Sequence, residues 1–255
     1  MLRPFLCTLL LTTALAAQTL TDLERRAAAG DHDAQTALGT LYETGDAVAL
    51  DPARALRLYR EAAAAGHVGA QINLATMYLE GAGVKKDAVA AVQWFTRAAE
   101  GGSTLAQLNL GMIFEVGEPP VKANAAQAAR RYRQAAAQGL MPAQYRLARL
   151  YEEGRGVPRD LDQAATWYRK AADQTDPAAQ LRLGILLSPG NGARTDLVEA
   201  YKWLNLSASR WKSEVLRVEA AARRDALEKQ MTEAQVSEGI QRSLRWQDTV
   251  GMQQK

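Results

Sequence analysis

One pattern recurs five times at nearly constant spacing, and it limits the possible folds more than any other feature of the sequence. Each copy opens with an Ala-Gln pair, and successive pairs lie 36, 36, 37 and 36 residues apart. The alanines of the five pairs are Ala34, Ala70, Ala106, Ala143 and Ala179. A repeat of this length is one supersecondary unit, which cannot bury its apolar side chains without a neighbour. The spacing therefore predicts a stack of similar units around a continuous core.

The first half of each repeat is expected to form a helix. After the Ala-Gln pair of the first repeat, Leu38, Leu41 and Tyr42 continue one apolar stripe at helical spacing. Gly39 lies beside this stripe, where a small residue lets a neighbouring helix approach closely. In the first four repeats a glycine in the left-handed conformation is expected to end this helix, namely Gly45, Gly81, Gly117 or Gly154.

The second half of each repeat is expected to form another helix, which begins at an Asp or Asn N-cap. These residues are Asp51, Asp87, Asn124 and Asp160. Three tryptophans share one position in these helices and are expected in the core: Trp94, Trp167 and Trp203. No segment alternates between apolar and polar residues with period two, so the sequence predicts an all-α fold.

The repeats share three short motifs: the run A-x-x-x-L-G-x-x-Y, the loop G-x-G-V and the ending W-[FY]-x-x-A-A. They are most complete in residues 70–101 and 143–174. This pattern resembles the Sel1-like repeat, a relative of the tetratricopeptide repeat. The resemblance covers about residues 20–209, and implies a right-handed α-solenoid of five helix-turn-helix repeats with helical caps at both ends. The loops at Gly45-Asp46-Ala47-Val48 and Ser188-Pro189-Gly190-Asn191-Gly192 depart from the motif, so their shapes are expected to differ.

The repeat register divides the rest of the chain. We expect a signal peptide at 1–16, a capping half repeat at 20–33, repeats at 34–69, 70–105, 106–142, 143–178 and 179–209, and a C-terminal helical cap at 210–255. Within that cap, a polar helix over about 213–229 is expected to pack through Val215, Leu216, Val218, Ala221 and Leu227. Thr232 and Gln235 form a capping box for a last helix that is expected to end near Trp246.

The N-terminal residues MLRPFLCTLLLTTALAAQ have the features of a secretory leader. A single charge at Arg3 precedes a short apolar core, which ends in Ala14-Leu15-Ala16. The sequence therefore predicts cleavage near Ala16 and, from the bacterial style of the leader, a periplasmic or secreted protein. A retained membrane anchor is the alternative. The one cysteine, Cys7, lies in the leader, so the mature chain would be held by packing without a disulfide.

Few residues are candidates for chemistry. The 31 basic and 28 acidic residues nearly balance, which argues against a nucleic-acid partner. His32 and His67 occupy equivalent turns and are expected to be solvent-exposed residues rather than metal ligands. Residues 209–212 match the S-x-x-K pattern of penicillin-recognising serine enzymes, but the companion motifs S-D-N and K-T-G are absent. We therefore predict no catalytic residue, no metal site and no cofactor.

The positions that vary between repeats are the better functional candidates, because packing does not fix them. By resemblance to tetratricopeptide proteins, the first helices would line a concave groove. The candidate partner-binding residues are Ile72, Asn73, Thr76, Leu108, Asn109, Met112, Tyr145, Arg146, Arg149 and Arg182. In tetratricopeptide grooves, Asn and Arg at these positions commonly hold the backbone or carboxylates of a peptide. The alternative is that the apolar members pack against adjacent helices.

Three functions follow as hypotheses. The first is an adaptor or regulator that binds another protein or peptide of the cell envelope, such as a sensor or an assembly component, and meets the membrane only through that partner. The second is a structural scaffold of a secretion or polysaccharide-export complex. The third is a hydrolase of cell-wall or β-lactam substrates. The oligomeric state stays open.

Overall fold

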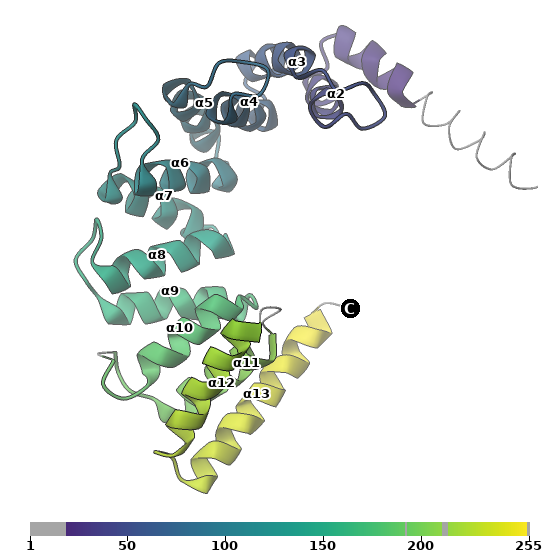
Figure 1. Ribbon diagram of the computed structural model, residues 1–255. Coiled ribbons are helices and arrows are strands. Elements are labelled where there is room, and N and C mark those ends of the chain that lie inside the picture. The colour runs from purple at the N-terminus through teal and green to yellow at the C-terminus, as the bar shows by residue number, and fades with distance from the viewer. Residues whose placement is uncertain (1–18, 192, 211–213, 254–255) are drawn as a thin grey trace, which may run out of the picture. The chain divides into compact units, whose positions relative to one another are not determined.

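A computed structural model describes residues 19–191, 193–210 and 214–253, and within these ranges the chain is helical without a strand (Figure 1). One isolated antiparallel bridge joins Glu118 and Val121 in a loop. The all-α prediction is confirmed. The predicted leader lies outside the described residues. The chain divides into two compact units after Ala123, and each unit is described by itself.

Unit 1 contains two complete helix pairs and the first helix of a third. A helix over residues 19–28 precedes them, as expected for the capping half repeat. The later helices are α2 (His32–Thr44), α3 (Pro52–Ala64), α4 (Val68–Glu80), α5 (Ala88–Glu100) and α6 (Thr104–Val116). Here α2, α4 and α6 are first helices of their repeats, and α3 and α5 are second helices. Each packs on the next along the chain.

Unit 2 begins with a second helix and ends in the C-terminal helices. Its elements are α7 (Ala125–Ala137), α8 (Met141–Glu153), α9 (Leu161–Asp173), α10 (Pro177–Leu187), α11 (Leu197–Arg210), α12 (Glu214–Glu228) and α13 (Glu233–Gln253). Here α8 and α10 are first helices, and α7, α9 and α11 are second helices. Both α12 and α13 pack on α11.

The helix boundaries follow the predicted caps with one exception. The side chains of Asp51, Asp87, Asn124 and Asp160 each accept a backbone N–H of the first turn of a second helix. Three of the four predicted glycines cap first helices in the left-handed conformation: Gly45, Gly81 and Gly154. Gly117 differs, with φ 85° and ψ 149°. Its loop has one extra residue and contains Pro119-Pro120, so the chain leaves the helix in another direction.

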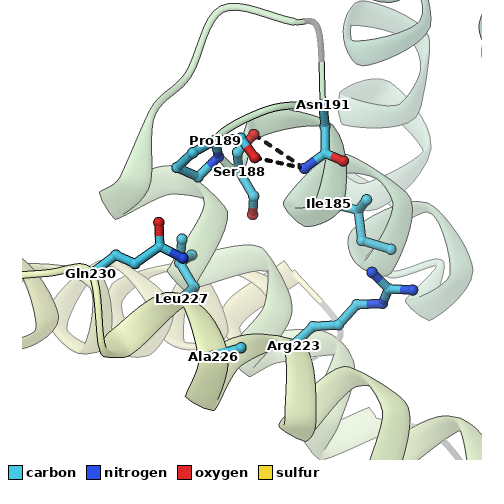
Figure 2. A pocket seen from close by; sticks show the side chains of 8 residues that line it. All are labelled: Ile185, Ser188, Pro189, Asn191, Arg223, Ala226, Leu227 and Gln230. Carbon is cyan, nitrogen blue, oxygen red and sulfur yellow. Dashed lines mark hydrogen bonds between the residues drawn. The ribbon is translucent and has the colours of Figure 1, made fainter.

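The helix α10 is shorter than the other first helices, because a proline follows it. It has 11 residues, whereas α2, α4, α6 and α8 have 13 each. A residue before proline avoids the helical region, and Ser188 accordingly has φ −77° and ψ 154°. The Asn191 side chain then donates to the carbonyl oxygens of Ser188 and Pro189 (Figure 2). The loop that begins at Ser188, which was expected to differ in shape, therefore differs because the helix before it ends early.

The core is built from the second helices, whose large residues pack on small residues of the first helices. Tyr59, Phe95, Tyr132, Tyr168 and Leu204 are each at most 1% exposed. A Cβ added to Gly39 would lie 2.6 Å from Cε1 of Tyr59, and one added to Gly184 would lie 2.6 Å from Cγ of Leu204. The close approach predicted at these small residues is therefore confirmed at both positions.

The tryptophan prediction is correct at one position of three. Trp203 is 1% exposed and packs edge-on against Trp246, with 5.8 Å between ring centroids. Trp94 and Trp167 are only half-buried, and the Arg97 and Lys170 side chains lie over their rings. The shared position precedes the buried residue of each second helix by one, which is about 100° around the helix. It is therefore covered only where another helix lies beside it, as α13 does at Trp203.

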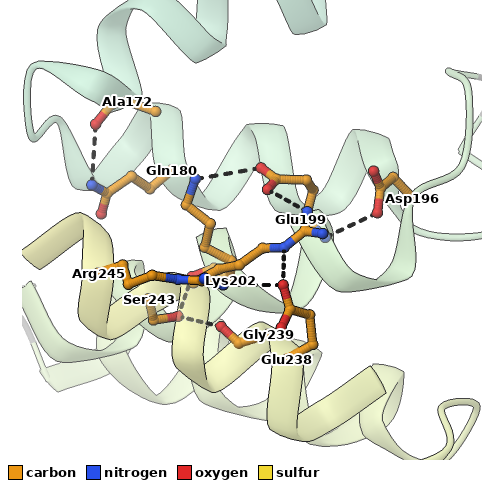
Figure 3. Close-up of polar contacts among 10 residues, drawn as sticks. Ala172, Gln180, Asp196, Glu199, Lys202, Glu238, Gly239, Ser243 and Arg245 are labelled. Atoms are coloured by element: carbon orange, nitrogen blue, oxygen red, sulfur yellow. Dashed lines mark hydrogen bonds and ion pairs between the residues drawn. The ribbon is translucent and has the colours of Figure 1, made fainter. Parts of the chain in front are cut away.

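A buried glutamine ties first helices to the helix before them. The Nε2 groups of Gln35, Gln71, Gln144 and Gln180 donate to the carbonyl oxygens of Ala27, Ala63, Ala136 and Ala172, at 3.2 to 3.3 Å. Figure 3 shows this bond at Gln180. The acceptors lie in the last turns of helices, and each also accepts the backbone N–H three residues on, as Ala63 does from Gly66 at 3.1 Å. The glutamine of the Ala-Gln pair thus adds a second hydrogen bond to a helix end and links that end to the next helix.

The second glycine of the G-x-G-V loop lies against the start of a second helix. A Cβ added to Gly83 would lie 2.7 Å from the carbonyl carbon of Pro52, and one added to Gly156 would lie 2.2 Å from that of Ala125. Both glycines also have positive φ, at 67° and 70°. The motif therefore needs glycine for the close contact as well as for the turn.

We expect Gly156→Ala to lower the free energy of unfolding by roughly 2 to 5 kcal/mol. Backbone strain accounts for about 1 to 2 kcal/mol, and the clash with the Ala125 backbone for about 1 to 3 kcal/mol more. Gly139→Ala is the matched control, because Gly139 has φ 91° with no neighbouring atom within 4 Å of an added Cβ. Denaturant unfolding measures both variants. Equal losses would show that the loop contact contributes nothing.

The C-terminal cap forms as two helices, with differences from prediction at their exposed faces. Leu227 of α12 is buried, but Val215 and Val218 are 77% and 57% exposed. They were expected to pack, yet the buried residues of α12 are Ala220 and Leu227, on another side. Thr232 and Gln235 form the predicted capping box. Helix α13 runs beyond Trp246 to Gln253, because no Gly or Pro lies between Trp246 and Gly251 and Val250 still packs, at 9% exposed.

Polar contacts join α13 to α11. The Glu199 carboxylate accepts hydrogen bonds from Lys202 at 3.4 Å and from Arg242 of α13 at 3.0 Å. Ser243 is 1% exposed and donates to the carbonyl oxygens of Gly239 and Lys202 (Figure 3). The last helix is thus fixed to the second helix of the fifth repeat. No helix of the described residues is both long and apolar enough to cross a membrane.

Candidate interaction surface

In unit 1, the predicted surface residues of α4 and α6 differ in exposure. Met112 is 39% exposed, whereas Leu108 is only 8% exposed. Ile72, Thr76 and Asn109 are half-buried. The alternative, that the apolar members pack against adjacent helices, therefore describes Leu108. The other four keep part of their side chains available.

Asn73 takes part in a hydrogen-bond cluster rather than pointing freely to solvent. The Tyr59 hydroxyl donates to Oε2 of Glu43 at 2.7 Å, lies 3.0 Å from the Thr40 hydroxyl, and is bonded by the Asn73 side chain. Burial raises the pKa of Tyr59 above its ordinary value. The cluster joins α2, α3 and α4, so Asn73 holds a core hydroxyl in place.

In unit 2, the equivalent cluster carries an arginine in place of asparagine. The Tyr168 hydroxyl donates to Oε2 of Glu152 at 2.6 Å, and Nη1 of Arg182 lies 3.6 Å from the other oxygen of that carboxylate. Burial, with the Glu152 carboxylate, raises the pKa of Tyr168. Tyr145 packs on Tyr168 with 5.6 Å between ring centroids. The Arg182 side chain is 46% exposed, so one face of the guanidinium remains in contact with solvent.

Two arginines of α8, Arg146 and Arg149, are also held by neighbouring groups. Arg149 donates to Oε1 of Glu153 at 2.9 Å, and Arg155, in the loop after α8, donates to the second oxygen of that carboxylate at 3.1 Å. Partial burial acts to raise the pKa of Glu153, but the two guanidinium groups outweigh it and the pKa lies below its ordinary value. Arg146 lies 6.0 Å above the Tyr132 ring. Nearby carboxylates and rings thus hold the arginines in place before any partner arrives.

The first helices of the two units differ in charge. The helices α2, α4 and α6 contain no Lys or Arg, whereas α8 and α10 contain Arg146, Arg149 and Arg182. We call the first-helix positions of unit 1 whose side chains remain partly accessible (Ile72, Thr76, Asn109 and Met112) the uncharged strip. Those of unit 2 (Tyr145, Arg146, Arg149 and Arg182) are the arginine strip. The same register of the repeat therefore carries different chemistry in each unit.

The histidines have structural roles that the sequence did not indicate. His67 is half-buried and is the N-cap of α4, where its Nδ1 accepts the Ala70 N–H at 3.1 Å. Its Nε2 lies 2.8 Å from Oδ1 of Asp33. His32 is exposed, as expected, in the first turn of α2. The exposed-turn prediction is wrong for His67, because this repeat uses the imidazole where the first repeat uses Asp31 as a cap.

Among the described residues no metal-ligand cluster is found, and the serine of the S-x-x-K match is hydrogen-bonded. No group of three or more His, Cys, Asp or Glu side chains could hold a metal ion in that part of the chain. The Ser209 hydroxyl of the S-x-x-K match donates to the Leu206 carbonyl oxygen at 2.8 Å. Lys212 lies outside the described residues. The geometry at Ser209 therefore gives the hydrolase hypothesis no support.

Comparison with known proteins identifies the repeats. The family model described as Sel1 repeat matches five segments, at 32–67, 68–103, 104–140, 142–176 and 177–210. One similar structure is a protective antigen present in uropathogenic Escherichia coli strains, which displays an SLR fold. It is 34% identical over 90% of this chain and 48% of that chain, with a TM-score of 0.73.

A second similar structure is a Sel1 repeat protein from Oxalobacter formigenes. It is 31% identical over 79% of this chain and 82% of that chain, with a TM-score of 0.71. The chain spans about half the length of the E. coli antigen. No protein of curated function matches the chain.

Proposed function

The chain belongs to the Sel1 repeat family, and from this premise we propose that it is an exported adaptor or regulator that binds one partner protein of the cell envelope. Sel1 repeats generally mediate protein–protein interactions. The first helices provide the binding surface. The partner, the compartment and the surface are all parts of this proposal.

The difference between the two strips is the observation that carries the proposal. Packing requires the same residue types in every repeat, and the core positions satisfy that requirement. The strip positions instead change from uncharged to cationic at the same register. Arginine binds carboxylates through two parallel hydrogen bonds. The arginine strip therefore suits an acidic segment of the partner, and the uncharged strip suits a segment with apolar or hydroxyl side chains.

We expect capture of the partner from envelope extracts to depend on the arginine strip. Arg149→Gln combined with Arg182→Gln should weaken capture at least tenfold, because each charged hydrogen bond contributes about 1.5 to 3 kcal/mol. Arg130→Gln combined with Arg217→Gln is the matched control, since it removes the same two charges from exposed positions on α7 and α12. Quantitative pull-down against immobilised protein measures the loss. Equal capture by all three proteins would refute the role of the strip.

The leader-like sequence of residues 1–18 supports the envelope assignment, and export is tested separately. A fusion of residues 1–18 to a reporter should place the reporter outside the cytoplasm, and the mature protein should begin near Ala17. Mass spectrometry of the N-terminus measures this directly. Protein from envelope fractions that still begins at Met1 would contradict cleavage.

A further inference from the structure

A hollow lies between the end of α10 and the helix α12, at the point where Pro189 ends α10 early. Its volume is about 190 Å³. Figure 2 shows Ser188, Pro189 and Asn191 on one side of it and the side chains of α12 on the other. Pro189 occupies the register of Glu80 and Glu153, which are the last residues of the longer helices α4 and α8. The hollow is therefore specific to the fifth repeat.

The loop side of the hollow has few polar groups left to offer. The Ser188 hydroxyl donates to the Gly184 carbonyl oxygen at 2.8 Å. The Asn191 amide donates to the carbonyl oxygens of Ser188 and Pro189 at 3.2 and 3.3 Å. Ile185, Pro189 and Leu227 contribute apolar surface, so the walls are about equally polar and apolar. The space is many times larger than one water molecule needs, so a side chain of a partner can enter it.

Two polar side chains border the hollow on the side opposite the loop. Arg223 lies in α12, Gln230 lies two residues after the end of that helix, and both line the hollow. The Nε and Nη2 groups of Arg223 each lie 3.2 Å from the same Glu219 oxygen. Its Nη1 group makes no hydrogen bond to the described residues. The pair is exposed, with Arg223 at 49% and Glu219 at 43%, so it is weak and a second carboxylate can bind.

We propose that this hollow binds the C-terminal residue of a partner chain. An aliphatic side chain lies against Ile185 and Leu227, and the terminal carboxylate accepts hydrogen bonds from Arg223. A C-terminal residue carries an aliphatic side chain and a main-chain carboxylate on the same Cα, which is the combination that these apolar residues and Arg223 can bind together. Gln230 is placed to bond the peptide backbone that leads away. This hollow would bind the partner in addition to the two strips. The proposal rests on the proposed function only in one respect, namely that the ligand is part of a protein.

Short peptides test the hollow without any knowledge of the partner. The probes are fluorescein-labelled Gly-Ser-Gly-Leu with a free carboxylate, the same peptide as its amide, and Gly-Ser-Gly-Gly. Fluorescence anisotropy with the full mature chain should show binding of the first probe, and at least tenfold weaker binding of the other two. Equal affinity for the acid and the amide, or no binding of any probe, would overturn the proposal.

Two variants with matched controls locate the binding. Ala226→Phe should fill the hollow and abolish binding, whereas Ala222→Phe adds the same group at an exposed position of α12 that does not line it. Arg223→Gln should weaken binding of the acid at least tenfold, whereas Arg217→Gln should not. Melting temperatures show whether each variant is folded. Unchanged binding by folded Ala226→Phe protein would place the peptide elsewhere. Because no partner is used, such a failure leaves the capture experiment on the arginine strip unaffected.

Discussion

Deletion of residues 70–105 should leave a soluble helical protein, whereas deletion of residues 70–87 should prevent folding. The longer deletion removes one whole 36-residue unit and joins Gly69 to Ala106, so the start of α4 continues as α6 in the same register. Each repeat contacts mainly its neighbouring repeats, so the remaining repeats can still stack. Circular dichroism and cooperative urea unfolding measure the outcome.

The shorter deletion joins Gly69 to Ala88 and places one second helix directly after another. The buried residues of α5 would then lie where α3 packs on Ala70, Leu74 and Met77 of α4. Buried Phe95 has no matching space there, and the core at α3 is left open. If both deletions give equally cooperative unfolding, the register described above is wrong.

Trp203→Ala should lower the free energy of unfolding by roughly 3 to 5 kcal/mol, the range for a large aromatic residue removed from a core. Trp203 is 1% exposed and connects α11 to α13 through its contact with Trp246. Its Nε1 group has no hydrogen-bond partner among the described residues, so the loss comes from packing and from the Lys202 ammonium, which lies 4.0 Å from the ring centroid. Denaturant unfolding followed by circular dichroism gives the value.

Trp94→Ala is the control for Trp203, because it removes the same side chain at the same register of another repeat. Trp94 is half-buried, and we expect a loss of about 1 to 2 kcal/mol in proportion to its smaller buried area. Losses of equal size at the two positions would show that repeat register, rather than burial, determines the contribution of the tryptophan.

Much of the fold could be predicted because every structural feature of the repeats occurs in several copies. The N-caps from Asp51 to Asp160 were recognisable by their common register, and the buried residues from Tyr59 to Leu204 by theirs. Burial at the flank of a helix depends instead on what lies beside that helix. Trp94 and Trp203 share a register, yet only Trp203 has α13 against it.

The C-terminal cap was the part of the fold that the sequence predicted least well. It has a single copy, so no second example separates packing residues from exposed ones. Val215 and Val218 match a helical apolar stripe equally well whether or not a helix covers them. The extent of α13 past Trp246 was missed for the same reason.

The sequence predicted which residues share one row of the candidate surface, but it did not predict which side chains those residues contact. The sequence places Asn73 and Arg182 in one row, but the partners of Arg182 and Asn73 come from earlier helices. Glu152 reaches Arg182 from 30 residues upstream, and Tyr59 reaches Asn73 from the preceding second helix. Such pairs depend on the angle between neighbouring helices, which one sequence does not specify. Pro189 was the one local signal for the hollow beside α12.

The buried glutamines also bear on how a gene of this kind can change in length. Each bonds a carbonyl oxygen eight residues upstream, for example Gln144 to Ala136. A tandem duplication of 36 residues, wherever its ends fall, copies each glutamine together with a suitable acceptor at that distance. The new copy needs no compensating mutation elsewhere. Unequal recombination can therefore add or remove copies in single steps, and each intermediate length is itself a protein that selection can retain.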